Sequence, residues 1–343
     1  MNFASDNHYG AAPEIFAALA AVGTAPAPAY GDDPVTARVR DRLSAIFERP
    51  VAVYPVINGT TANSLSLATL VPPHGAVFCH EEAHIAVDEC GAPEFFTHGA
   101  KLVPITGRDA KLTPAAITEA LKRFHKGSVH HAQPAAVSLT QATELGTVYA
   151  PDELAALSRL AHGEGMKVHM DGARFANALA GLGCSPAQMT WKSGVDVLSF
   201  GATKNGALAA EAVIFFDPAD ARDFEFRRKK SGHLLSKMRF VSAQLEAYLA
   251  NDLWLRNARR ANGLAQRLAQ GLAQADAVTI AHPVGANAVF ARMPAALAKK
   301  LRAAGAVFYD WGAPGGDGTV LARLMLSFAT PEADVARLIE LAS

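Results

Sequence analysis

Cysteine is scarce in this sequence, and neither sign of charge is in excess. Three cysteines are scattered among 343 residues, too few and too far apart for a disulfide framework or a cysteine-based metal site. We therefore expect no bound metal. The 32 Lys and Arg residues are matched by 32 Asp and Glu residues. Because there is no net positive charge, we expect neither nucleic acid nor an anionic membrane as a partner.

Long apolar runs are missing as well. Charged residues interrupt every stretch before it reaches the roughly 18 apolar residues of a membrane span. The first ten residues, MNFASDNHYG, have neither the basic region nor the apolar core of a signal peptide. Since 50% of the residues are hydrophobic and only 19% are charged, the chain can bury enough surface to fold. We expect a soluble cytoplasmic enzyme.

Short apolar runs alternate with longer segments of helical period. The runs are almost continuously apolar, as expected for strands covered on both faces. We predict strands at 51–57, 76–79, 101–105, 135–139, 167–170, 195–200 and 212–216, and helices at 35–48, 115–124 and 154–162. Each of these helices begins with a capping residue or a proline. The alternation predicts an α/β fold with a mostly parallel sheet.

The pattern changes after the last of these strands. Residues 217–271 form a long helical segment with a basic start, and short strands at 278–281, 287–291 and 320–327 follow, with two helices. The length of the chain suits one large domain and one smaller domain. We therefore expect a large domain over residues 1–240, then a linking helix and a small α+β domain over residues 241–343.

Three predicted strand ends carry residues suited to a ligand. Ligands of a parallel sheet bind beyond the carboxyl ends of its strands. The first strand leads into Asn58-Gly59-Thr60-Thr61 and a helix, where glycine, hydroxyl groups and free N–H groups suit a phosphate. The turn lacks the Gly-Lys-Ser/Thr ending of a P-loop. Taken alone, it is better explained as a capped helix start.

The other two strand ends carry an aspartate and a lysine. Asp171, followed by Arg174, fits either a structural ion pair or a carboxylate that faces a protonated ring nitrogen. Lys204 stands among small residues, and it fits either a solvated loop or a desolvated amine that reacts with a carbonyl group. The order of phosphate turn, aspartate and lysine is that of fold-type I pyridoxal-phosphate enzymes.

The sequence also resembles a particular family, the L-threonine aldolases. The stretch 169–174, His-Met-Asp-Gly-Ala-Arg, resembles the signature of that family. Further matches are Ser5-Asp6, residues 30–34, Gly59-Thr60 with Asn63, and His84-Ile85. The resemblance runs from about residue 5 to the end. Residues 88–96 and 199–206 resemble the low-specificity bacterial branch that includes phenylserine aldolase. Two stretches depart from the better-known branch, Asn58-Gly59-Thr60 and Thr140-Gln141-Ala142-Thr143.

The resemblance implies pyridoxal 5'-phosphate as the cofactor and assigns roles around it. Lys204 would hold the cofactor aldehyde, and Asp171 would keep the ring nitrogen protonated so that the ring acts as an electron sink. Gly59 and Thr60 would bind the phosphate, and His84 would stack on the ring. Arg174 would reach the 3-oxygen of the cofactor and the substrate carboxylate.

The resemblance also implies substrate contacts. Ser5 and Arg323 would bind the substrate carboxylate, and Tyr30 would lie in the same site. Arg323 is an unusual charge within an apolar strand, so we expect an anionic partner opposite it. His130 aligns with a histidine near the substrate hydroxyl group. The base for that hydroxyl would be His84, His130 or a water that they hold, and we favour His84.

The implied reaction cleaves L-β-hydroxy-α-amino acids such as L-threonine, L-allo-threonine and L-phenylserine into glycine and an aldehyde. Alternatives within the same fold are a β-eliminating lyase, an aminotransferase or a racemase. A non-catalytic scaffold is disfavoured because it would need neither Lys204 nor Asp171.

A basic run over residues 227–239 precedes a long apolar-periodic helix, where positive charge opposes the helix dipole. In most proteins such a run is a solvated helix start. In the resembling family this region comes from a neighbouring subunit and approaches the cofactor phosphate. We therefore expect a homodimer or homotetramer in which Arg239 or Lys237 reaches the phosphate bound by the partner.

Overall fold

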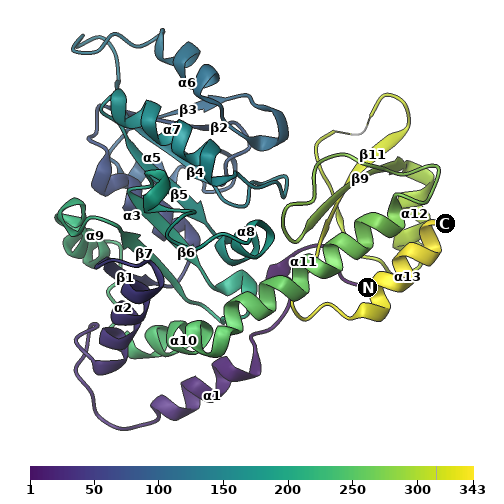
Figure 1. Cartoon of the computed structure of the whole chain (residues 1–343), viewed down its shortest axis with the longest axis horizontal. Coiled ribbons are helices and arrows are strands. Elements are labelled where there is room, and N and C mark those ends of the chain that lie inside the picture. Colours follow the sequence, from purple (N-terminus) through teal and green to yellow (C-terminus); the bar gives the residue numbers. More distant parts are fainter. Residues whose placement is uncertain (314) are drawn as a thin grey trace.

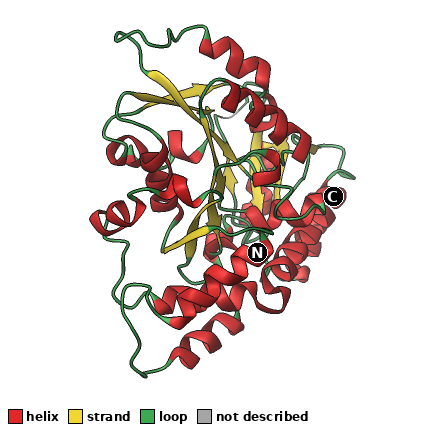
Figure 2. Cartoon of the chain, turned by 60° about the vertical axis from the view of Figure 1, so that its left-hand side comes forward, coloured by secondary structure: helices red, strands yellow, loops and turns green. Residues whose placement is uncertain are grey.

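The computed structural model describes residues 1–313 and 315–343. Its larger part contains a seven-stranded sheet with helices on both sides (Figures 1 and 2). The strands are β1 (Ala52–Val56), β2 (Gly75–His80), β3 (Lys101–Ile105), β4 (Gln133–Thr140), β5 (Lys167–Gly172), β6 (Val197–Gly201) and β7 (Glu211–Phe215). All seven predicted strands are therefore present, and the α/β fold is confirmed.

The strands lie in the order β1-β7-β6-β5-β4-β2-β3. Strand β7 runs antiparallel to both of its neighbours, and all the pairs from β6 through to β3 are parallel. The mostly parallel sheet is thus confirmed. Strands β4, β5 and β6 run in the same direction. Near their carboxyl ends, Asp171 therefore lies between Thr140 on one side and Ser199 on the other.

Helices surround the large sheet: some connect its strands, whereas others precede β1 or follow β7. They are α1 (Pro13–Val22), α2 (Pro34–Ile46), α3 (Gly59–Leu70), α4 (His84–Val87), α5 (Ala92–Phe96), α6 (Pro114–Leu121), α7 (Pro151–Gly163), α8 (Phe175–Leu182), α9 (Phe224–Lys230) and α10 (Arg239–Leu249). The three predicted helices correspond to α2, α6 and α7. Asp33 and Thr113 cap the first two with side-chain oxygens that accept hydrogen bonds from backbone N–H groups.

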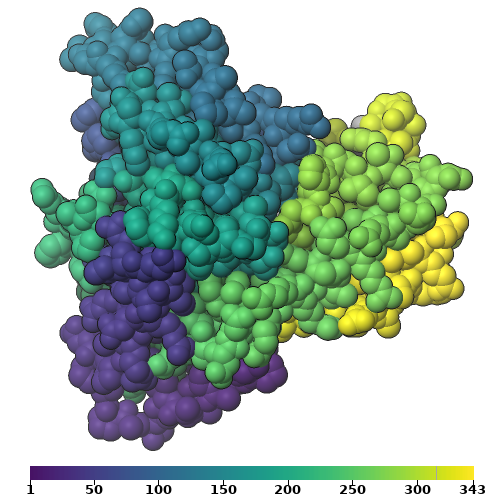
Figure 3. Space-filling view, in the orientation of Figure 1, coloured from purple at the N-terminus to yellow at the C-terminus, as the bar shows by residue number. Residues whose placement is uncertain are grey.

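A smaller part forms a separate lobe beside the large one (Figures 1 and 3). Its sheet has the antiparallel order β10-β11-β9-β8. The strands are β8 (Thr279–Ile280), β9 (Ala288–Pro294), β10 (Tyr309–Asp310) and β11 (Thr319–Met325), and the helices are α12 (Ala295–Ala303) and α13 (Glu332–Ala342). Strand β10 was not predicted. The predicted division at residue 240 stays a prediction.

Helix α11 (Leu253–Leu272) joins the two parts, and it contributes to both hydrophobic cores. Its first turns bury Trp254 and Ala258 in the large core, and its later turns bury Leu264 and Leu268 in the small core. Phe3, from the start of the chain, also lies in the small core. The N-terminal segment therefore packs against the C-terminal lobe.

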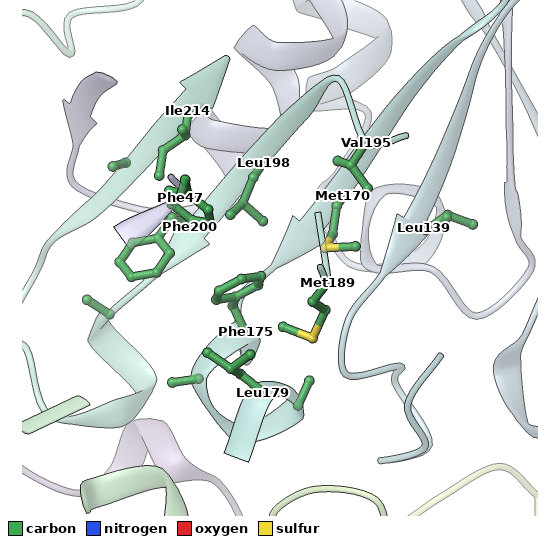
Figure 4. Close-up of a cluster of buried hydrophobic side chains, with 14 of the residues drawn as sticks. Phe47, Leu139, Met170, Phe175, Leu179, Met189, Val195, Leu198, Phe200 and Ile214 are labelled. Carbon is green, nitrogen blue, oxygen red and sulfur yellow. The ribbon is translucent and has the colours of Figure 1, made fainter. Parts of the chain in front are cut away.

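The large core lies directly beneath the ends of β5 and β6. Figure 4 shows Phe47, Phe175, Leu198 and Phe200 packed together there. The Phe175 ring is stacked nearly parallel to that of Trp254, with an interplanar angle of 7°. This dense aromatic packing fixes the strands whose ends carry Asp171 and Lys204.

The turns at these strand ends approach each other closely. A Cβ atom on Gly201 would lie 2.6 Å from the carbonyl oxygen of Ala173. Only glycine fits at this position, so the chain can bring the end of β6 against the residue that follows Gly172. In residues 1–313 and 315–343, no helix is both long and apolar enough to cross a membrane.

Candidate active site

One cavity collects residues from the ends of β2, β4, β5 and β6 and from the start of α3. It is lined by Gly59, Asn63, His84, Glu89, Thr140, Ala142, Glu144, Asp171, Ala173, Arg174 and Lys204. The structure therefore brings together five of the predicted site residues, namely Gly59, His84, Asp171, Arg174 and Lys204. Thr60 follows Gly59 directly in the first turn of α3.

Asp171 is held from two sides at the end of β5. Its Oδ2 accepts a hydrogen bond from Asn63 Nδ2 at 2.8 Å, and its Oδ1 accepts one from the Ala173 backbone N–H at 2.9 Å. The carboxylate is buried, with 5% of its surface exposed. These contacts fix the orientation of the carboxyl group.

His169 lies two residues earlier on the same face of β5 and is completely buried. Its two ring nitrogens lie 2.9 Å from Ser138 Oγ and 3.0 Å from Ser199 Oγ. Burial lowers the pKa of His169 to about 4, so the ring is neutral at physiological pH. His169, the first residue of the 169–174 signature, therefore connects β5 to β4 and β6 beneath the cavity.

Lys204 lies in a 3-10 turn, Thr203–Asn205, directly after β6. The buried Glu211 on β7 accepts hydrogen bonds from the backbone N–H groups of Ala202 and Thr203, and so holds this turn in place. Burial and the Arg174 guanidinium lower the pKa of Lys204, although Asp6 and Asp171 oppose the change. A lowered pKa increases the fraction of Lys204 that is present as the neutral amine, the form that attacks carbonyl groups.

Arg174 is paired with a residue from the start of the chain. Its Nε and Nη2 donate to the two carboxylate oxygens of Asp6 at 2.8 and 3.0 Å. Asn287 Nδ2 donates to the same carboxylate at 3.1 Å. Burial alone would raise the pKa of Asp6, but Arg174, Lys204 and Asn287 outweigh it and lower that pKa. The charge of Arg174 is thus largely compensated within the protein.

Arg323, on β11, lies near this pair. Its guanidinium carbon is 5.4 Å from the Tyr309 ring centre and 4.8 Å from that of Trp311, and its Nη2 donates to the Ala4 carbonyl at 3.2 Å. Its Nε is buried and has no hydrogen-bond partner among the described residues. Ser5, the next residue after Ala4, caps the short helix Asp6–His8. The unpaired Nε fits an anionic ligand.

His84 is connected to Asp171 through two side chains. Its Nδ1 lies 2.8 Å from Glu89 Oε1, which also accepts a hydrogen bond from Asn63 Nδ2 at 2.9 Å. Asn63 in turn donates to Asp171. The hydrogen bond to Glu89 raises the pKa of His84, with Asp171 adding to the effect and burial opposing it.

The predicted phosphate turn has the expected form. Helix α3 begins at Gly59, and the Asn58 side chain accepts a hydrogen bond from the Thr61 N–H at 2.8 Å. Within the described part of the chain, the N–H groups of Gly59 and Thr60 have no acceptor. A Cβ on Gly59 would meet nothing within 4 Å. The helix therefore presents two free N–H groups to open space, as phosphate binding requires.

Six predicted site residues are not among those that line this cavity. Thr60, Ser5 and Arg323 are described above, and the other three are His130, Tyr30 and Arg239. His130 is in an exposed turn just before β4, whereas the cavity lies at the other end of that strand, roughly 25 Å away at about 3.3 Å per residue. Within one chain, the structure therefore contradicts the predicted place of His130 at the site. Tyr30 is 46% exposed, and its N–H donates to the Ser236 carbonyl. Arg239 is the first residue of α10, which begins shortly after Ser236 in the sequence.

Sequence reasoning missed three acidic residues of the site. Asp6 and Glu89 were part of the matching stretches, but no role was predicted for them, and Glu144 was not considered. Glu211 also went unnoticed, although a glutamate at the start of an apolar strand is a visible signal. Glu144 gives no such signal, because it follows the strand end Thr140-Gln141-Ala142-Thr143 in an ordinary polar turn.

The fold and the cavity together define a fold-type I pyridoxal-phosphate-dependent enzyme. A reactive lysine, a buried carboxylate and free helix N–H groups fit the aldehyde, ring nitrogen and phosphate of that cofactor. Residues 2–296 match the β-eliminating lyase family. The chain is 48% identical to a low specificity L-threonine aldolase of Pseudomonas aeruginosa, over 99% of this chain and 95% of the relative. It is also 47% identical to a low specificity L-threonine aldolase of a Pseudomonas species, over 98% and 95% of the two chains.

The chain belongs to the low-specificity L-threonine aldolase family, and it is a pyridoxal-phosphate-dependent carbon–carbon lyase. A structure titled threonine aldolase of Leishmania major superposes with a TM-score of 0.94 at 28% identity, covering 99% of this chain and 98% of the other. A serine palmitoyltransferase of Sphingomonas wittichii shares the fold at a TM-score of 0.72 and 15% identity, with coverage of 100% and 86%.

Proposed function

We propose that this enzyme cleaves L-β-hydroxy-α-amino acids, including L-threonine, L-allo-threonine and L-phenylserine, into glycine and an aldehyde. The observation that carries the proposal is the cavity that unites Lys204, Asp171 and Arg174, with Arg323 beside them. These groups supply an amine, a carboxylate and two guanidinium groups, which a cofactor and an amino acid both need. When bound, pyridoxal 5'-phosphate supplies the electron sink for breaking the Cα–Cβ bond.

Each residue has one task in this proposal. Lys204 would hold the cofactor aldehyde through its amine. Asp171, fixed by Asn63 and Ala173, keeps the ring nitrogen protonated, and the free N–H groups at Gly59 and Thr60 bind the phosphate. His84, which lines the cavity, would contact the cofactor ring.

The substrate carboxylate has a separate set of partners in this proposal. Arg323 binds it through the unpaired Nε, with Ser5 beside it. Arg174 contributes its positive charge, while two of its nitrogens remain on Asp6.

The β-substituent of the substrate is bound loosely in this proposal. Asn63, Glu89 and Asp171 are hydrogen-bonded to one another. We expect the polar atoms of the cavity to serve the cofactor and the amino, carboxylate and hydroxyl groups of the substrate, and not its β-substituent. A site without such polar recognition discriminates weakly between alkyl and aryl groups. We expect the aromatic substrate to be favoured, because residues 88–96 and 199–206 resemble the phenylserine branch.

The direct test is a comparison of kcat/KM for L-threonine, L-allo-threonine and L-phenylserine, with the aldehyde and glycine products identified. A keto acid product would indicate an aminotransferase, and elimination products would indicate a β-eliminating lyase. Rejection of either threonine or phenylserine by more than about 10⁴-fold would contradict loose recognition of the β-substituent.

The active unit in this proposal is a homodimer or homotetramer. Arg239 Nε is buried without a partner among the described residues, and Lys237 next to it is exposed. Tyr30 lies on the same side of the molecule, where its N–H donates to Ser236. Lys237 and Arg239 do not line the cavity of their own chain. Their positive charges could bind the cofactor phosphate in the cavity of a partner subunit. We also expect the enzyme to work in the cytoplasm, which cell fractionation would test.

Mixing two inactive variants tests this assembly. Lys204→Ala removes the lysine, and Arg239→Ala removes the cation that the partner is expected to supply. Reassembled mixtures should regain activity in sites that draw the intact residues from different chains. Normal cofactor binding by Arg239→Ala, or a fully active monomer, would contradict the shared site.

A further inference from the structure

Glu144 is a carboxyl group of the cavity to which the tasks above give no role. It lies in the turn that follows β4, and hydrogen bonds within the turn hold it in place. Gln141 and Tyr149 exchange two hydrogen bonds of 2.9 Å across its base. Inside the turn, the hydroxyl groups of Thr143 and Thr147 lie 2.8 Å apart. The turn therefore presents Glu144 to the cavity from a defined position.

The two carboxyl oxygens of Glu144 are in different situations. Its Oε1 accepts hydrogen bonds from the His84 backbone N–H at 3.0 Å and from Thr140 Oγ1 at 2.8 Å. Its Oε2 is buried and has no hydrogen-bond partner in residues 1–313 and 315–343. Leaving a buried polar atom unpaired is costly, and a hydroxyl group of a ligand in the cavity would pair with it. One oxygen is thus anchored while the other is available.

We propose that Glu144 takes the proton of the substrate β-hydroxyl group during carbon–carbon cleavage, which rests on the proposed retro-aldol function. The O–H bond breaks and its proton moves to Oε2 of Glu144. The electron pair of that bond forms the C=O bond of the departing aldehyde. The electron pair of the Cα–Cβ bond stays with the Cα fragment, for which the cofactor would supply the electron sink, and a proton from solvent then forms the new Cα–H bond of glycine. The same carboxyl group then returns its proton to solvent before the next turnover.

The charges around Glu144 suit this task. Burial raises the pKa of Glu144 to about 7, with Asp171 adding to the effect and Thr140 and the His84 backbone opposing it. A general base works best when its pKa lies near the working pH. Four titratable or charged groups around Glu144 interact with its charge, namely Asp171, Arg174, Cys79 and Tyr149. His84, Glu89 and Lys204 line the same cavity.

His84, which the sequence favoured for this task, is less suited to it. Its Nδ1 is held by Glu89 Oε1, and that hydrogen bond raises the pKa of His84. Because Nδ1 is engaged, the ring can offer the substrate hydroxyl group only Nε2, and only while the ring is neutral. In addition to its proposed contact with the cofactor ring, His84 anchors Oε1 of Glu144 through its backbone N–H.

The test replaces Glu144 with glutamine, which keeps the size and one oxygen acceptor but cannot accept a proton. For Glu144→Gln, we expect kcat/KM for L-threonine to fall by about 10²–10⁴-fold. The rise of kcat/KM with pH through about pH 7 should disappear as well. Exchange of the Cα proton of glycine with D₂O, which involves no β-hydroxyl group, should stay within about threefold of wild type. Cofactor binding, followed by absorbance, should be unchanged.

Two further variants separate this role from its alternatives. Glu89→Gln should keep the rise of kcat/KM near pH 7. If Glu89→Gln lost this rise and Glu144→Gln kept it, the base would be His84. Glu340→Gln, a surface change at an exposed ion pair, should match wild type in every measurement. A kcat/KM for Glu144→Gln within threefold of wild type would overturn the proposal.

A measurement on the cofactor-free protein gives a readout that does not depend on turnover. Burial also raises the pKa of Glu211 to about 7. With ¹³C-labelled glutamate, two carboxyl resonances should therefore titrate near pH 7 in wild type, and one of them should be absent from Glu144→Gln. If every glutamate resonance titrates in the ordinary range, the proposal fails. Should Glu144→Gln not fold, Glu144→Asp keeps the carboxyl group, and it must keep the rise near pH 7 at reduced kcat/KM. A wild-type enzyme that releases no aldehyde from any β-hydroxy-amino acid would instead refute the retro-aldol function itself.

Discussion

Replacement of Asp6 by alanine should destabilise the protein strongly, because it leaves the Arg174 guanidinium without its counter-charge. The side chains of Asp6 and Arg174 are 1% and 18% exposed, so solvent screens this pair only slightly. Removing one partner of a buried ion pair costs about 3–5 kcal/mol. The change also removes the acceptor for Asn287 Nδ2. We therefore expect Asp6→Ala to lower the free energy of unfolding by about 3–5 kcal/mol at pH 7.

The assay is urea unfolding of the cofactor-free protein, with the midpoint compared at an unchanged slope. Glu340→Ala is the matched control, because the Arg337–Glu340 pair is 54% and 70% exposed and should contribute less than about 1 kcal/mol. A loss for Asp6→Ala no larger than that of the control would refute the reasoning. Arg174 would then not depend on Asp6 for compensation.

The pH dependence of the same pair has a definite sign. The pKa of Asp6 lies below its ordinary value of 3.8 in the folded protein. Its contribution to stability is therefore fully present above the unfolded pKa, and it is lost as the pH falls through the folded pKa. The difference in unfolding free energy between wild type and Asp6→Asn should be constant from pH 6 to pH 8 and shrink below about pH 4. A difference that grows on acidification would contradict this assignment.

Three further changes test other parts of the structure. Lys204→Ala should keep the fold, as judged by circular dichroism, and abolish turnover, whereas more than a few per cent of activity without added amine would show that another group reacts. Asp171→Asn should retain the cofactor and lose at least about 100-fold in kcat, since a positioned charge contributes a few kcal/mol, and a severalfold loss would exclude that role. Phe175→Ala, in the fully buried aromatic core, should cost about 3–5 kcal/mol of unfolding free energy, and a loss below 1 kcal/mol would show that the core collapses around the gap.

The large sheet could be predicted from the sequence because its strands are covered on both faces. Burial on both faces requires almost continuous apolar runs, and these are visible without any structure. The direction of β7 was not predicted, although the connection over residues 202–210 is too short for a crossover between parallel strands. Strand β10 has only two exposed residues, Tyr309 and Asp310, and leaves no apolar pattern to detect.

The site was predictable where its residues stand at strand ends. Asp171 and Lys204 were identified because parallel strands bring their carboxyl ends to one edge of the sheet. The pairing of Asp6 with Arg174 spans 168 residues and depends on how the start of the chain packs, which no local pattern encodes. His130 was misplaced within the chain because a family resemblance gives a position in the sequence, but not the end of the strand at which it lies.

The path of the first residues has a consequence for synthesis of the enzyme. Phe3 exchanges backbone hydrogen bonds with Val307 and Met325, and Ala4 accepts one from Arg323. Asn287, whose side chain donates a hydrogen bond to Asp6, is made 281 residues after Asp6. At about 5–20 residues per second, this interval is roughly 14–56 s. The seven-stranded sheet is complete in sequence well before then. Residues 3–6 must therefore wait for partners in the small lobe, and the region around the cavity reaches its final form only after those partners have been made.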